Sequence, residues 1–201
     1  MRSWKNKVVI ISAAILFLIT ACFSVGAYNR HRAYDLLNEV VSLRLGAATF
    51  SDAQRLAKKY GGWPWGADSE VCSSRKCRLK FVFYNTLLNH IQNQREVSLA
   101  ASLTVENGFI VSREIDYSIL ARTWSSQYMY VVSEDSRLNG TSATVVKRLK
   151  IDSDGRPHWV EVALYADATS ELRQRAYSLN LACLARLSDC SSLASVVPVG
   201  F

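Results

Sequence analysis

An unbroken run of apolar residues lies near the N-terminus of the chain. Residues 8–28 contain no charged side chain, and as an α-helix a run of this length spans about 30 Å, the thickness of the hydrocarbon core of a bilayer. Trp4 and Tyr28 bracket the run, and aromatic residues are typical of the two membrane interfaces. The pattern therefore predicts one transmembrane helix, with the membrane as a partner through residues 8–28.

Three fates of this segment are open. The run is longer than the apolar part of a usual signal peptide, which holds about 7 to 15 residues, and its length favours a retained anchor. Val25 and Ala27 fit cleavage by a signal peptidase after Ala27. The residues Ile19–Cys22 resemble a bacterial lipoprotein box, so lipidation of Cys22 is the third alternative.

The rest of the chain has the length of one domain, because domains usually hold roughly 100 to 200 residues. We expect residues 1–32 to form the membrane anchor or signal segment with its basic flanks. Residues 33–201 contain no internal repeat and no low-complexity tract. We expect them to form a single extracytoplasmic α+β domain.

Helical spacing of apolar side chains marks three segments of this domain. An amphipathic helix is predicted over Ala33–Leu45, continuous with the anchor or just after it. Thr49 and Asp52 have the spacing of a capping box at the start of a second helix, which Gly61 ends. A third helix is predicted to begin at Thr169, with one apolar stripe formed by Leu172, Ala176, Leu179, Cys183 and Leu187.

Between the second and third helices the hydrophobic period changes to two. Val97–Glu106 alternates most regularly, and its apolar members share one face of a strand. The other predicted strands are 79–84, 109–117, 127–133, 143–151 and 158–165, with a short helix over 86–91 and turns at Asn107-Gly108, Asn139-Gly140 and Asp154-Gly155. The predicted fold is α+β, an N-terminal transmembrane helix followed by an antiparallel sheet of about six strands packed with two or three helices.

Four cysteines outside the apolar run form two local pairs, Cys72 with Cys77 and Cys183 with Cys190. An even number of cysteines in short loops predicts two disulfides, although other pairings are open. The spacings differ from the C-x2-C knuckle of zinc sites, and free thiols in a cytosolic domain are the remaining alternative. Disulfides would place the N-terminus in the cytoplasm and residues 33–201 on the oxidising, extracytoplasmic side of the cell membrane.

The formal charge of +7 is concentrated around the apolar run. Five of the basic residues flank it, and without them the chain has 19 bases against 17 acids. A domain that is close to neutral and has no basic stripe lacks the electrostatic surface that binds phosphate backbones. We therefore expect no nucleic-acid partner. The flanking basic residues are Arg2, Lys5, Lys7, Arg30 and Arg32.

Catalytic chemistry has few candidates in this chain. A serine or cysteine hydrolase needs an imidazole, and the only histidines are His31, His90 and His158. None lies in a catalytic motif, and the chain has no phosphate-binding glycine loop, zinc-protease helix or C-x-x-C redox pair. The sequence favours a protein without enzymatic activity, metal or cofactor, and a hydrolase that uses His158 or His90 is an alternative.

Two pairs of neighbouring carboxylates are the nearest candidates for an acid and a base. Glu114 lies two residues from Asp116, and Glu134 is next to Asp135. We interpret all four as solvated groups on strand faces and turns, because charged side chains are seldom buried.

Two tryptophans flank a proline after the second predicted helix. Exposed side chains of Trp63 and Trp65 would form a contact loop that stacks on sugars or touches a membrane. Alternatively, the two rings cover the core beneath the first disulfide.

Two segments resemble known proteins. Ser51–Gly62 (SDAQRLAKKYGG) and Arg175–Cys183 (RAYSLNLAC), followed by Cys190, resemble uncharacterised bacterial exported proteins with one anchor. The glycine, threonine cap and glycine-terminated helix of Gly46–Gly62 are similar to BamE-like outer-membrane assembly lipoproteins. The first resemblance implies no function. The second implies a role in envelope assembly, but six strands exceed the sheet of that family, and no functional residue is carried over.

Together these features predict a membrane-anchored extracytoplasmic protein that binds or scaffolds an unknown envelope protein without catalysis. The alternative is a carrier of small apolar ligands. A curved sheet covered by a helix leaves room for a lined cavity of about 300 Å³ or more, and Trp63–Trp65 would then lie at its entrance.

Overall fold

A computed structural model describes residues 2–66, 72–85, 95–121, 127–138, 145–151, 157–165, 167–185, 190 and 192–198. The fold is α+β, as predicted, with one N-terminal apolar helix and one mixed sheet. The helices are α1 (Arg2–Ser42), α2 (Phe50–Tyr60) and α4 (Ser170–Ala176), with the 3-10 turns η1 (Leu181–Leu184) and η2 (Leu193–Ser195). The strands are β1 (Trp63–Pro64), β2 (Lys76–Tyr84), β3 (Arg95–Glu106), β4 (Phe109–Ala121), β5 (Gln127–Asp135), β6 (Val145–Ile151) and β7 (Pro157–Leu164).

The strand order of the sheet is β1-β2-β3-β4-β5-β7-β6. From β2 to β5 the strands form the predicted antiparallel meander. The chain then departs from it, because β6 takes the edge and β7 inserts between β6 and β5. As a result β5 and β7 run parallel, with Val132 opposite Val162. The prediction of a wholly antiparallel sheet is wrong at this one pairing.

The Trp-Pro segment forms a short edge strand, where we had expected a loop. Trp63 pairs with Lys80 and Pro64 with Leu79 of β2. Proline fits this place because its missing N–H faces away from the ladder at a sheet edge.

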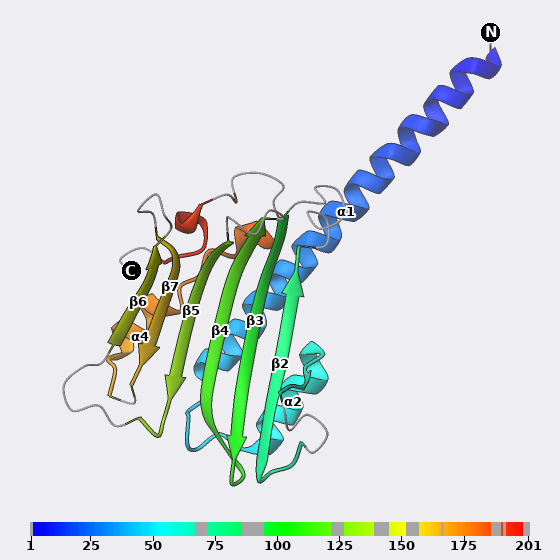
Figure 1. Ribbon diagram of the computed structural model, residues 1–201. Coiled ribbons are helices and arrows are strands. Elements are labelled where there is room, and N and C mark those ends of the chain that lie inside the picture. The colour runs from blue at the N-terminus through cyan, green and yellow to red at the C-terminus, as the bar shows by residue number, and fades with distance from the viewer. Residues whose placement is uncertain are drawn as a thin grey trace.

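Two layers make up the globular part. In Figure 1 the sheet lies in front and α1, α2 and α4 lie behind it. The strands alternate accordingly, with buried side chains toward the helices and a mixture of polar and apolar, less buried side chains on the other face. The predicted apolar face of β3 is buried: Val97, Leu99, Ala101, Leu103 and Val105.

Two local sequence signals are confirmed, the capping box of a helix and a hairpin turn. The Thr49 side chain and Asp52 form the predicted capping box of α2, and Gly61 ends the helix in the left-handed region. Asn107 and Gly108 both have positive φ, 51° and 88°, as a tight hairpin turn between β3 and β4 requires.

Helix α1 runs without interruption from the apolar segment into the core. The described side chains between Val9 and Val25 are exposed, and this half projects away from the sheet in Figure 1. It is apolar and long enough to cross a membrane. The later half packs on the sheet and α2. Gly26 is buried, and a Cβ added there would lie 3.5 Å from Cα of Ala185. The other buried residues of this half are Ala33, Leu36, Leu37 and Val40.

The C-terminal region differs from the single long helix that we predicted. Helix α4 ends at Ala176, whose carbonyl accepts a hydrogen bond from the Tyr130 hydroxyl at 2.9 Å. Asn180 then caps the separate turn η1, because asparagine favours helix starts over helix interiors. Leu187, the helix predicted over 86–91 and the turns predicted at Asn139-Gly140 and Asp154-Gly155 lie outside the described residues.

Candidate binding site

A buried arginine marks the point where α1 ends. Arg113 of β4 points toward the helices at a position where the alternation calls for an apolar residue, and only 4% of it is exposed. Its Nη1 donates to the carbonyls of Val40 and Val41, both at 2.7 Å, and of Leu43 at 3.1 Å. The last carbonyls of a helix have no partner within the helix and carry partial negative charge. Arg113 therefore caps the C-terminus of α1.

Glu134 of β5 binds the other edge of the same guanidinium. The two residues face each other in the β4–β5 register, and Nε of Arg113 donates to Oε2 of Glu134 at 3.0 Å. Nε of Arg173, in α4, donates to Oε1 at 2.8 Å. Two guanidiniums therefore share one buried carboxylate, and charge-assisted bonds of this kind are the strong ones in proteins.

Tyr177 closes this cluster on the side of α4. Its ring centroid lies 5.2 Å from Cζ of Arg113, a cation–π distance. Its hydroxyl donates to Oε2 of Glu134 at 3.4 Å. Burial raises the pKa of the Tyr177 phenol above its ordinary value, so the hydroxyl keeps its proton and remains a donor.

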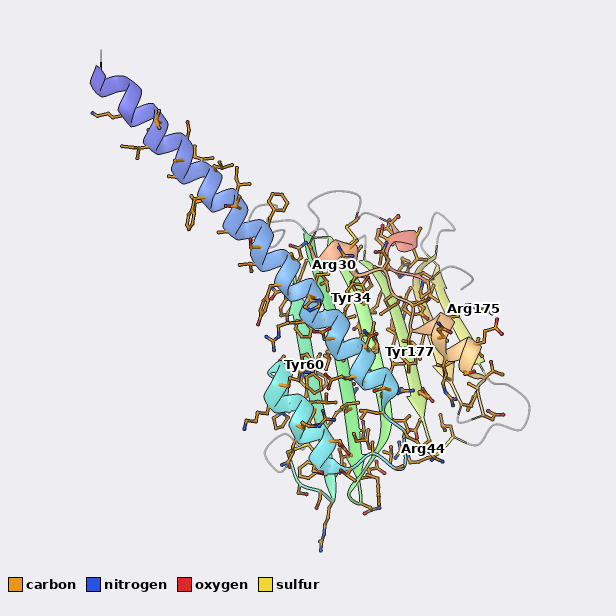
Figure 2. All side chains as sticks on the ribbon, turned by 180° about the vertical axis from the view of Figure 1, so that it is seen from behind. Arg30, Tyr34, Arg44, Tyr60, Arg175 and Tyr177 are labelled. Atoms are coloured by element: carbon orange, nitrogen blue, oxygen red, sulfur yellow. A yellow bond between two sulfur atoms is a disulfide. The ribbon has the colours of Figure 1, made fainter. Side chains whose placement is uncertain are left out.

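A pocket of about 340 Å³ opens above this cluster. Figure 2 shows Arg44 just beyond the end of α1, and Tyr177 on the same helix-covered side of the sheet. The walls combine three guanidiniums and one carboxylate with short aliphatic side chains. The lining residues are Val41, Leu43, Arg44, Leu45, Arg113, Glu134, Ser136 and Arg173.

The lining is suited to binding an anion rather than to moving protons. Arginine stays protonated at physiological pH and presents a planar fork of donors that matches carboxylates and phosphates. The pocket exceeds the 300 Å³ that we set for a carrier of apolar ligands, but its charged lining differs from the apolar wall that such a carrier needs. Trp63 and Trp65 are not part of the lining.

The two tryptophans lie at the β1 edge of the sheet, and each is about two-fifths exposed. Nζ of Lys80 lies 4.4 Å from the centroid of the Trp65 ring, and Cζ of Arg78 lies 5.4 Å from it. The Trp65 ring therefore stacks against basic side chains of β2, and both tryptophans are partly exposed.

The sulfur atoms of both predicted cysteine pairs lie at bonding distance. Cys72 is joined to Cys77, and Cys183 to Cys190. The second disulfide is buried beside Asn85, whose Nδ2 donates to the Cys183 carbonyl at 2.7 Å. Both bonds fit an oxidising compartment.

The other candidates from the sequence do not gather at one place. Cys22 lies within the apolar half of α1, and His90 lies outside the described residues. His158 is on β7 and does not line the pocket. His31 faces Asp35 one helical turn away, with Nε2 3.5 Å from the carboxylate.

Two carboxylates that we expected to be solvated are withdrawn from water. Glu134 is only 5% exposed, so that interpretation is wrong for it. Asp116, on the other face of the sheet, has a buried Oδ1 without a hydrogen-bond partner among the described residues. Burial, with repulsion from Glu114, raises the pKa of Asp116 to about 6.

Sequence reasoning missed Arg44, Arg113 and Arg173 as site residues. One signal was available, because Arg113 and Glu134 interrupt the apolar alternation of two strands with opposite charges. Opposite charges at inward positions of adjacent strands predict a buried ion pair once the strands are aligned.

No protein-family model matches the chain, and searches of curated proteins and of solved structures find no significant match.

Proposed function

We propose that this chain is a single-pass membrane protein whose sheet domain lies on the extracytoplasmic side and binds a ligand or partner without catalysis. The observation that carries the proposal is the continuity of α1. Its exposed apolar half would be unfavourable in water, because each Å² of apolar surface costs about 25 cal/mol, whereas its second half is part of the core. The folded domain is therefore joined directly, through one helix, to the segment that we propose lies in the membrane.

The orientation is inferred from the sulfur chemistry. Disulfides persist in secreted and periplasmic spaces and are rare in the cytosol. With both bonds in the domain that follows α1, the N-terminus is assigned to the cytoplasm. The binding role is supported by the pocket, whose guanidiniums present the planar fork of donors that matches carboxylates and phosphates.

Orientation can be tested with single cysteines in a Cys22→Ser background. Ser51 is exposed on α2, and Ser3 precedes the apolar run. In intact spheroplasts a membrane-impermeant maleimide should label Ser51→Cys, and it should label Ser3→Cys only after the membrane is permeabilised. Labelling in the reverse pattern would reject the proposed topology.

The redox state of the native cysteines is the companion measurement. Denatured protein from untreated cells should expose no thiol at Cys72, Cys77, Cys183 or Cys190 until a reductant is added. Free thiols at all four positions would remove the argument for an oxidising compartment. Photocrosslinking in intact envelopes then identifies the partner.

A further inference from the structure

We propose that the pocket at the end of α1 binds a small, diffusible aliphatic carboxylate, with Arg44 as the guanidinium that pairs with it. This inference rests on the proposed binding function and names the ligand class for it. It concerns the described lining of the pocket and assigns no role to the tryptophans at the sheet edge.

The charge of the pocket is not balanced by its own residues. Among the described lining residues, three guanidiniums face one carboxylate, an excess of two positive charges. The Arg113 guanidinium is occupied by Glu134 and by the carbonyls at the end of α1. Arg173 is anchored on the same carboxylate. An entering anion would reduce this excess, and partial burial makes the interaction stronger than on an open surface.

Arg44 is the lining arginine whose guanidinium is available to that anion. It follows the last turn of α1 and is exposed. No carboxylate of the described residues forms an ion pair with it, in contrast to Arg113 and Arg173. One uncommitted guanidinium matches one carboxylate in a bidentate pair, which favours a monoanion over a phosphate dianion.

The rest of the lining selects for an aliphatic body of limited size. Val41, Leu43 and Leu45 are half-buried and form the apolar wall. A volume of about 340 Å³ lies at the small end of ligand pockets, which usually hold about 300 to 1,000 Å³. A short carboxylic acid fills such a space with its chain on the apolar wall and its carboxylate at Arg44.

The position of the pocket along α1 excludes lipids of the anchoring bilayer. Fourteen residues of unbroken helix separate Tyr28, at the end of the apolar run, from Ser42, beside the pocket. At 1.5 Å per residue they hold the pocket about 20 Å from the membrane interface, and the usual tilt of about 20° shortens this only slightly. The ligand must therefore reach the pocket through solution.

The test is a calorimetric titration of the full chain in nanodiscs with valerate. Valeramide, which has the same shape without the charge, and inorganic phosphate are titrated in parallel. We expect saturable binding of valerate in about the millimolar range, with valeramide and phosphate each bound at least about tenfold more weakly.

A matched pair of variants places the binding at the pocket. Arg44→Gln should weaken valerate about tenfold or more, because a charge-assisted hydrogen bond is lost. Arg75→Gln, at another exposed arginine in the loop before β2, should change binding by less than about twofold. Circular dichroism checks that both variants fold.

Three results would overturn the inference. The first is that valerate does not bind saturably, and the second is that valeramide or phosphate binds as tightly as valerate. The third is an unchanged affinity for valerate in Arg44→Gln. These results leave the orientation of the domain and the state of its cysteines untouched. Failure of this inference is therefore distinguishable from failure of the proposed membrane topology.

Discussion

Single residues of this protein are most informative where they interrupt a regular pattern. Thr49 and Asp52, or Asn107 and Gly108, act within a few residues of one another, so their capping and turn geometry follows from the sequence. The partnership of Arg113 with Glu134 could not be predicted in the same way. It needs the register of two strands, which a local pattern does not fix.

Asp116 should make stability depend on pH. Its pKa is raised from 3.8 to about 6 in the folded protein, so the folded state holds its proton more tightly than the unfolded state. The free energy of unfolding should therefore fall as pH rises from about 4 to about 6, by up to roughly 3 kcal/mol, and level off above.

Asp116→Asn should remove this fall. The measurement is urea unfolding of the full chain in detergent at pH 4.5 and pH 7, followed by tryptophan fluorescence. Asp167→Asn, at an exposed carboxyl before α4, is the control and should keep the wild-type pH dependence. The explanation fails if Asp116→Asn loses as much stability between the two pH values as the wild type does.

Gly62 is required by the close approach of Phe81. A Cβ at this position would overlap the ring of Phe81, which is fully buried and cannot move aside without disturbing the core. Gly62→Ala should lower the free energy of unfolding by about 1 to 3 kcal/mol through overpacking.

Gly26→Ala is the matched control for this substitution. Its Cβ would meet Ala185 at ordinary contact distances, and alanine favours a helix over glycine by up to about 1 kcal/mol. Chemical unfolding of both variants should therefore show a loss at position 62 and no loss at position 26. Equal effects would contradict the steric explanation.

At the scale of elements, periodicity predicted most helices and strands but not all of their connections. The meander from β2 to β5 is sequential, and hairpins of that kind are visible in the chain. The parallel pairing of β5 with β7 arises because β6 lies at the sheet edge beyond β7. Tertiary packing, and not the local sequence pattern, determines this order. The apolar residues from Leu172 to Cys183 have helical spacing in the sequence, but helix α4 ends at Ala176.

Arg113 should couple the end of α1 to the sheet. Arg113→Met fills similar space but leaves Glu134 without its main partner and the last α1 carbonyls uncapped. Breaking a buried ion pair from one side costs roughly 3 to 5 kcal/mol, and we expect a loss of that size in thermal or urea unfolding.

The control for this variant is Arg78→Met. Arg78 pairs with Glu114 at 3.3 Å on the exposed face of the sheet, where such pairs contribute about 0 to 1 kcal/mol. If both variants lose the same small amount, the buried cluster does not stabilise the helix end.

At the scale of the whole molecule, the anchor and the domain should behave as one body. Spin labels at Ser12→Cys on the exposed half of α1 and at Ser51→Cys on α2, in a Cys22→Ser background, should give one narrow distance distribution in nanodiscs. Three glycines inserted after Tyr28 should broaden it, because glycine loosens the helix. A broad distribution in the uninterrupted chain would reveal a hinge.

Because α1 is uninterrupted, it also fixes the rotation of the domain about the helix axis. One residue inserted between Phe17 and Leu18 would move the domain by only about 1.5 Å along the helix axis but rotate it by about 100° around that axis. Seven inserted residues would move it by about 10 Å and nearly restore its original rotation. The direction in which the pocket at Arg44 opens is therefore fixed relative to one face of the apolar half of α1. In the proposed topology, a neighbouring protein in the same bilayer would therefore meet the pocket from one fixed direction.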